Sequence, residues 1–157
     1  MTAQKRTEAA QDRVLVITRT FNAPRELVWK AWSDPQHFKH WMGPRDYPIV
    51  HTEGEFRQGG KWRGCLRSVA TGEEMWQSGE YREIKPPERL VFTFGWDRAD
   101  GTRSPETEVT VLFAEKQGKT LMTFTQAVFD TVGARDGHAE GWNSTFDRLA
   151  GHLATMA

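Results

Sequence analysis

The histidines are the residues of this chain best suited to metal binding or proton transfer, and the sequence contains five of them. His37 and His40 are three residues apart on a short predicted helix, which places them side by side. A structural metal site needs about four clustered ligands. We expect no cysteine or further carboxylate near this pair, so we predict a solvated pair and no metal site. His138 precedes Trp142 by four residues. It therefore edges the same helix face and is a candidate for a hydrogen bond to a ligand.

Cys65 is the only cysteine and the only strong nucleophile to consider. Arg63 and Arg67 flank it at two residues on either side of a predicted strand, so all three share one face. Two cations could lower the thiol pKa and make it reactive, but a half-buried strand thiol without a role is the interpretation we favour. The chain has no nucleophile elbow, phosphate loop, zinc signature or dinucleotide fingerprint. The catalytic residues are therefore unknown, and we expect no cofactor.

Large aromatic rings dominate the apolar residues, with seven Trp and nine Phe. Along residues 89–97, Leu90, Phe92, Phe94 and Trp96 alternate onto one face. This face is either ordinary core or the wall of a ligand cavity. If a cavity exists, its predicted lining is Trp62, Phe94, Trp96, Phe124, Gln126, His138, Trp142 and Phe146.

Two polar residues within strands leave alternatives open. Gln126 continues the apolar face of Met122 and Phe124. A polar group there needs a partner, so Gln126 either orients a ligand or lies at the rim in water. Glu80 is either a buried carboxylate or an exposed strand charge, and we favour exposure because unpaired burial is costly.

The periodicity of the chain predicts the elements that carry these residues. Alternating and β-branched segments predict seven strands, and helical spacing predicts two short helices and one long one. The predicted strands are 14–21, 47–53, 61–69, 75–84, 89–97, 106–115 and 119–129. The predicted helices are 24–33, a short one that begins at 34–35 and stops before 43–44, and a C-terminal one from between 131 and 137 to about 153.

These elements predict an α+β domain with an antiparallel meander. Only the long last helix is large enough to cover the apolar face of the sheet, and the two short helices after the first strand close one end. A curved sheet does not meet a helix everywhere, so a cavity between them is plausible. We expect residues 1–12 to form a flexible polar arm and residues 13–157 to form one domain.

Composition excludes several classes of partner. Lys plus Arg equals Asp plus Glu, at 21 each, so the formal net charge is zero. A neutral chain with scattered basic residues has no general attraction to nucleic acid. The sequence also lacks a signal-like N-terminus and any apolar run of about 20 residues, so we predict no membrane span. With a single cysteine, a cytoplasmic location is expected.

Six motifs carry a resemblance to a known family. They are F-x-A-P-x-E-x-V-W-x-A-W-S-D-P at 21–35, W-x-G-P at 41–44, R-x-G-G-x-W at 57–62, G-x-Y-x-E-I-x-P-P-E-R-L-V-F-T at 79–93, T-x-V-T-V at 107–111 and E-G-W at 140–142, with Leu149 after the last. Their order and spacing resemble the START-like (SRPBCC) superfamily, in the branch of homologues of the activator of heat-shock-protein-90 ATPase. Glu55 stands where the branch usually has Asp, which is a conservative departure.

The resemblance implies a helix-grip fold, a curved sheet around a long C-terminal helix with an apolar cavity. It does not imply one activity. Three hypotheses follow. The first is binding of a small hydrophobic or amphipathic molecule, such as a lipid, as carrier or sensor. The second is a cyclase- or hydrolase-type enzyme that uses Gln126, Glu80 or His138. The third is a chaperone partner linked to stress response. A homodimer is left open.

Overall fold

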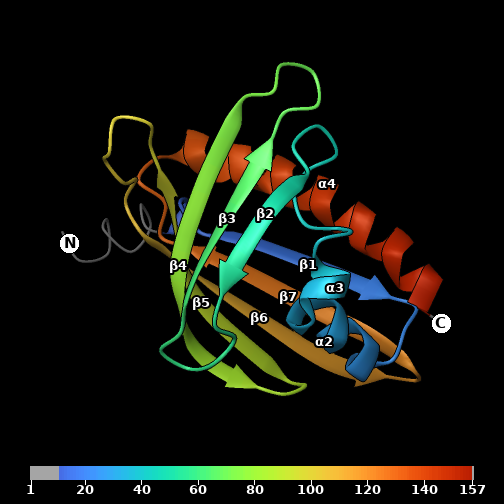
Figure 1. Ribbon diagram of the computed structural model, residues 1–157. Coiled ribbons are helices and arrows are strands. Elements are labelled where there is room, and N and C mark those ends of the chain that lie inside the picture. The colour runs from blue at the N-terminus through green and yellow to red at the C-terminus, as the bar shows by residue number, and fades with distance from the viewer. Residues whose placement is uncertain (1–10, 157) are drawn as a thin grey trace, which may run out of the picture.

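The computed structural model describes residues 11–156 and consists of one sheet, two short helices and one long helix (Figure 1). In chain order the elements are β1 (Leu15–Phe21), α2 (Arg25–Ser33), α3 (Pro35–Phe38), β2 (Ile49–Gly54), β3 (Lys61–Arg67), β4 (Glu74–Lys85), β5 (Arg89–Asp97), β6 (Thr107–Lys116), β7 (Lys119–Ala127) and α4 (Val132–Met156). The predicted α+β helix-grip arrangement is confirmed. Most of the polar arm predicted for residues 1–12 lies outside the described residues.

The seven strands form one antiparallel sheet in the order β1-β7-β6-β5-β4-β3-β2. Strands β2 to β7 follow one another as the predicted meander. β1 is the exception, because it pairs with β7 at the far edge, with Leu15 opposite Gln126. Helices α2 and α3 therefore carry the chain from one edge of the sheet to the other, which explains why they close one end of the molecule.

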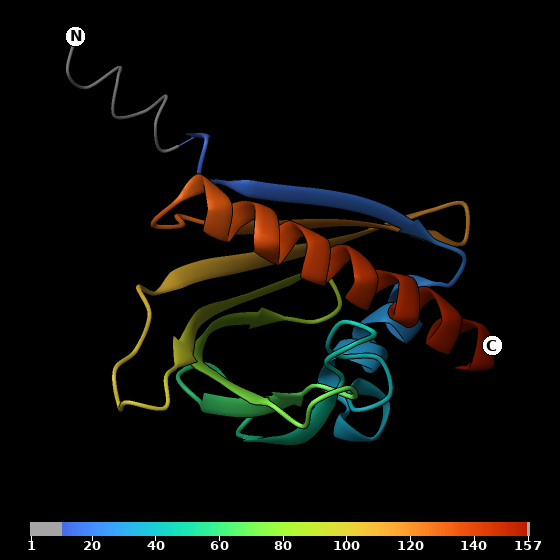
Figure 2. The same ribbon diagram turned by 90° about the horizontal axis from the view of Figure 1, so that it is seen from above.

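The sheet curls strongly at β4 and β5. Figure 2 shows that the sheet bends until β2 and β3 lie opposite β1 and β7, with α4 across the opening. Gly79 contributes to this curvature, because a Cβ atom there would lie 1.8 Å from the carbonyl oxygen of Thr93. The register between β4 and β5 also shifts between Tyr81 and Glu83, and such bulges bend and twist a strand.

Helix α4 presents one apolar face to the sheet, as its sequence predicts. Its buried residues are Trp142, Thr145, Phe146, Leu149 and Leu153. It begins within the expected interval and runs three residues beyond the predicted end, to Met156. The core fills the space between this face and the inner side chains of β1, β6 and β7. Within residues 11–156, no helix is long and apolar enough to span a membrane.

Candidate ligand cavity

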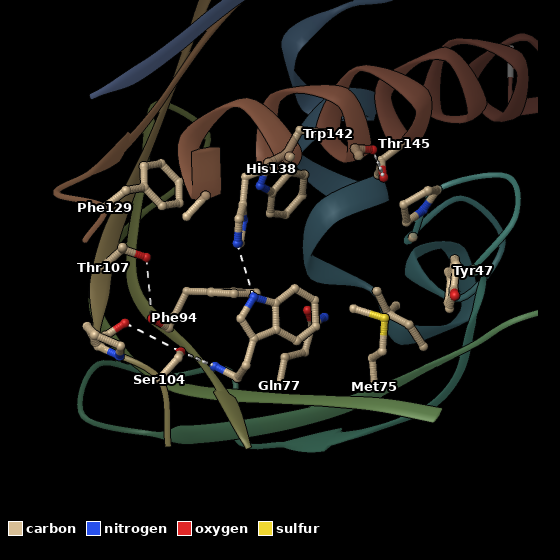
Figure 3. Close-up of a pocket in the computed structure, with 18 of the residues that line it drawn as sticks. Tyr47, Met75, Gln77, Phe94, Ser104, Thr107, Phe129, His138, Trp142 and Thr145 are labelled. Carbon is tan, nitrogen blue, oxygen red and sulfur yellow. Dashed lines mark hydrogen bonds between the residues drawn. The ribbon is translucent and has the colours of Figure 1, made fainter. Parts of the chain in front are cut away.

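A cavity of about 580 Å³ lies between the N-terminal half of α4 and the curled part of the sheet. The sheet contributes Leu66, Met75, Gln77, Phe94 and Trp96 to its wall. The remaining wall comes from Thr107 at the start of β6, from α4, from the loop after α3, from the segment between β5 and β6 and from the segment after β7. Figure 3 shows these side chains converging on one space from both layers.

Aromatic rings form most of the apolar wall. Phe94 and Trp96 are two residues apart on β5 and meet edge to face, with ring centroids 5.1 Å apart. Phe129 packs on His138 with centroids 4.8 Å apart. Trp142 faces them from α4 (Figure 3). These residues come from separate elements, so the wall exists only after α4 docks on the sheet.

His138 is neutral in this wall. The indole Nε1 of Trp96 donates to His138 Nε2 at 3.1 Å. Because an indole nitrogen can only donate, Nε2 must be unprotonated and the ring proton is on Nδ1. Burial lowers the pKa of His138 to about 4, although the carboxylate of Asp130 acts in the opposite direction. The imidazole therefore supplies hydrogen bonding without charge near pH 7.

Gln126 lies behind the cavity wall and is fully buried. Its Nε2 donates to Thr107 Oγ1 at 2.9 Å, and its Oε1 accepts from Trp142 Nε1 at 2.9 Å. Thr107 and Trp142 line the cavity, whereas Gln126 does not. The amide therefore positions two wall residues, an outcome that differs from both the ligand contact and the solvated rim considered from the sequence.

The other predicted lining residues fall into two groups. Phe94, Trp96, His138 and Trp142 lie together around the cavity, and Trp62 borders a smaller adjoining hollow of about 50 Å³. Phe124 and Phe146 are completely buried in the core, where their ring centroids are 5.2 Å apart. Alternation along a strand identified which residues face inward. It did not distinguish the residues packed in the core from those that border the cavity.

The wall also contains Gln77, Met75, Tyr47 and Thr145, which the sequence did not identify. The strand pattern could have identified Gln77, since it shares a face with Met75 on β4. Tyr47 lies in the loop after α3, and no period predicts where such a loop folds back.

The structure also bears on two residues that were considered for catalysis, Glu80 and Cys65. Glu80 is half-buried and borders a separate hollow with Arg82, Arg103 and Glu106. It does not border the cavity, so the enzyme hypothesis loses Glu80 as a group that could act beside His138. Cys65 is buried, and burial, followed by the charge of Glu74, raises its pKa despite Arg67 and Arg63. The raised pKa counts against the reactive-thiol alternative, and the thiol is buried where the favoured interpretation expected it to be half-buried.

The histidine pair has a third member that the sequence did not reveal. His37 Nδ1 lies 3.0 Å from His152 Nε2, and His40 stacks on His152 with ring centroids 5.4 Å apart. Burial, with His37 and His40 nearby, lowers the pKa of His152. Among residues 11–156, no group of three or more His, Cys, Asp or Glu could hold a metal ion.

Comparisons with known proteins agree with this architecture. A family model described as Activator of Hsp90 ATPase homolog 1-like protein matches residues 22–154. The AHSA1 protein of Silicibacter pomeroyi is 26% identical, with a TM-score of 0.83 over 92% of this chain and 99% of that chain. A protein of Arthrobacter aurescens is 24% identical, with a TM-score of 0.82 over 92% of this chain and 88% of that chain. No curated protein matches the chain.

Proposed function

The chain belongs to the family of Activator of Hsp90 ATPase homolog 1-like proteins, and from this premise we propose that it binds a small hydrophobic or amphipathic molecule as a carrier or sensor. The observation that carries the proposal is the cavity of about 580 Å³. Its size lies within the range of roughly 300–1,000 Å³ that ligand sites occupy. An apolar cavity of this size is unfavourable to leave empty, because its lining loses packing contacts.

The composition of the wall supports binding rather than catalysis. Phe94, Trp96, Phe129 and Trp142 supply aromatic surface, and the neutral His138 supplies a polar group without charge. An enzyme needs an acid or base within reach of a common point with a nucleophile or a second polar group. Glu80, the carboxylate considered for this role, borders a different hollow. Binding is therefore the function that the geometry favours.

Native mass spectrometry of protein purified without denaturant gives the first test. A small molecule that co-purifies and disappears after organic extraction would support the proposal, and its mass would identify the ligand class. Titration with the neutral apolar dye Nile red gives the second test, because it measures whether the cavity takes up an apolar probe saturably.

A pair of glycine substitutions on α4 locates the binding. Gly137 lines the cavity, and a Cβ atom there would have no atom within 4 Å. Gly151 has the same free space on the same helix, outside the cavity. Leucine is a better helix former than glycine by roughly 1 kcal/mol, so both variants should fold. We expect Gly137→Leu to weaken Nile red binding about tenfold or more and Gly151→Leu to leave it unchanged. Equal binding by all three proteins would refute the cavity as the site.

The family description also names activation of a chaperone ATPase, which motivates a second candidate, a chaperone-binding role. A pull-down against purified Hsp90-type chaperone tests it directly. Retention of the chaperone by both Gly137→Leu and wild type, with no dye binding by either, would favour this second function over the first.

A further inference from the structure

The side chain of Gln77 is the most deeply buried polar group of the cavity wall that has no hydrogen-bond partner among the described residues. It is only 6% exposed and borders both the large cavity and the smaller adjoining hollow. Among the hydrogen bonds within residues 11–156, none involves its amide. Figure 3 shows the amide end of Gln77 directed toward the cavity. A ligand that filled the cavity without bonding to this amide would leave it unpaired and cut off from water, which is costly, so the site favours a molecule that bonds to it.

Other polar groups of the wall already have partners within the protein. Thr107 Oγ1 donates to the carbonyl oxygen of Phe94 and accepts from Gln126. Thr145 Oγ1 donates to the carbonyl oxygen of Gly141, and Ser104 Oγ accepts from the backbone nitrogen of Trp96. These three hydroxyls already bond within the fold. His138 and Tyr47 also border the cavity but are only half-buried, so the Gln77 amide is the most deeply buried group of the wall with unused donor and acceptor capacity.

Among the described residues, none that lines the cavity is both charged and buried. Arg98 and Asp130 border the cavity but are exposed to solvent. His138 accepts a hydrogen bond at Nε2 from Trp96, which a protonated imidazole could not do. A carboxylate or ammonium group carried inside would therefore leave water without a counter-charge, which is strongly unfavourable. The wall selects against charged ends.

The rings that surround Gln77 suit a flat ligand. Gln77 pairs across the sheet with Trp96, and Phe94 meets Trp96 edge to face at 5.1 Å. Trp142 closes the opposite side from α4. Aromatic surfaces on two sides favour offset or edge-to-face contact with another ring.

On the basis of the proposed binding function, we propose that the ligand is an uncharged, ring-containing molecule with one amide or hydroxyl group, which the Gln77 amide receives. The primary amide of Gln77 offers both a donor and an acceptor. It therefore complements a group that also does both, but it carries no positive charge to balance a fatty-acid carboxylate.

Three probes that share one ring system test this class: naphthalene, 2-naphthamide and 2-naphthoate, each titrated at pH 7.5 in competition with Nile red. We expect wild-type protein to bind 2-naphthamide about tenfold more tightly than 2-naphthoate. Gln77→Met keeps a side chain of similar length without the amide. It should weaken 2-naphthamide binding about fivefold to tenfold and change naphthalene binding less than about twofold.

Met75→Leu is the matched control, because Met75 lines the same wall from the same strand. This substitution should change the Kd values of 2-naphthamide and naphthalene by the same factor. The ligand class is refuted if 2-naphthoate binds as tightly as 2-naphthamide, if Gln77→Met weakens both neutral probes equally, or if Nile red binds and none of the three competes. Failure of Nile red itself to bind would instead refute the proposed binding function.

Discussion

At the scale of single residues, His138 combines a structural contact with a proton-binding group. Its Nε2 accepts from Trp96 Nε1 at 3.1 Å, and its ring packs on Phe129 and Phe94. Protonation would place a charge among these rings and remove the acceptor. Burial among these rings is therefore the main reason that the folded protein resists protonation at this position.

This resistance predicts a loss of stability in mild acid. The folded pKa of His138 is about 4, against 6.5 for the free side chain. Between pH 6.5 and 4 the His138 side chain binds a proton in the unfolded chain but not in the folded chain. The free energy of unfolding therefore falls as the pH drops from 6.5 toward 4. Between pH 7.5 and 5.0 the expected loss is on the order of 2 kcal/mol.

Urea unfolding of wild type and His138→Gln at both pH values measures this loss. Glutamine keeps an acceptor for Trp96 but does not titrate. Between pH 7.5 and 5.0 the His138→Gln variant should therefore lose about 2 kcal/mol less stability than wild type. Carboxylates elsewhere affect both proteins equally. The same pH dependence in the two proteins would contradict the assignment.

At the scale of elements, α4 holds the loop that forms one side of the cavity. Arg148 donates to the carbonyl oxygens of Met42 and Gly43 at 3.1 and 2.8 Å, and to that of His40 at 3.0 Å. Met42, Gly43 and Tyr47 border the cavity. A planar guanidinium can reach several carbonyls at once, whereas a lysine ammonium cannot span them equally well.

Arg148→Leu should therefore loosen residues 40–47 without disturbing the sheet. Loss of these charge-assisted bonds should cost about 1–3 kcal/mol of stability. Hydrogen exchange should accelerate in residues 40–47 and remain unchanged in β6 and β7. The control is Asp147→Asn on the preceding residue, which removes the charge from the pair with Arg19 at 2.9 Å and should cost less than about 1 kcal/mol. Equal exchange in both variants would rule out the anchoring role.

At the scale of the whole molecule, the cavity joins the two layers of the fold. Its wall comes from β3, β4 and β5 on one side and from α4 on the other. A ligand inside contacts both layers, so its binding free energy adds to the stability of the entire domain.

We expect a ligand at 100 times its Kd to stabilise the folded state by about 2.7 kcal/mol. For a chain of 157 residues this raises Tm by roughly 5–10 °C. Calorimetry measures the shift, and hydrogen exchange should slow in both β5 and the N-terminal half of α4. Protection confined to one layer would place the ligand outside the cavity. Gly137→Leu should show a much smaller shift at the same ligand concentration.

The sequence by itself determined the elements, the α+β class and the family resemblance. Alternation along residues 89–97 and the spacing of Trp142, Phe146 and Leu149 reflect local geometry, because side-chain direction repeats every two residues in a strand and every 3.6 in a helix. The same periodicity correctly placed Phe94 and Trp96 on the inward face. Such patterns depend on neighbouring residues alone, which is why they can be recognised without a structure.

Only the tertiary structure decided which inward residues surround empty space. Phe124 and Phe94 both face inward, yet the first is sealed in the core and the second borders the cavity. The difference depends on the distance between the sheet and α4, which the curl at β4 and β5 sets. Likewise, Gln126 and Gln77 are both inward amides, but only Gln126 meets partners, because Thr107 and Trp142 reach it from other elements. Contacts between elements that are distant in sequence leave no periodic pattern in the sequence. The position of the Gln77 amide at the cavity is therefore seen only in the folded chain.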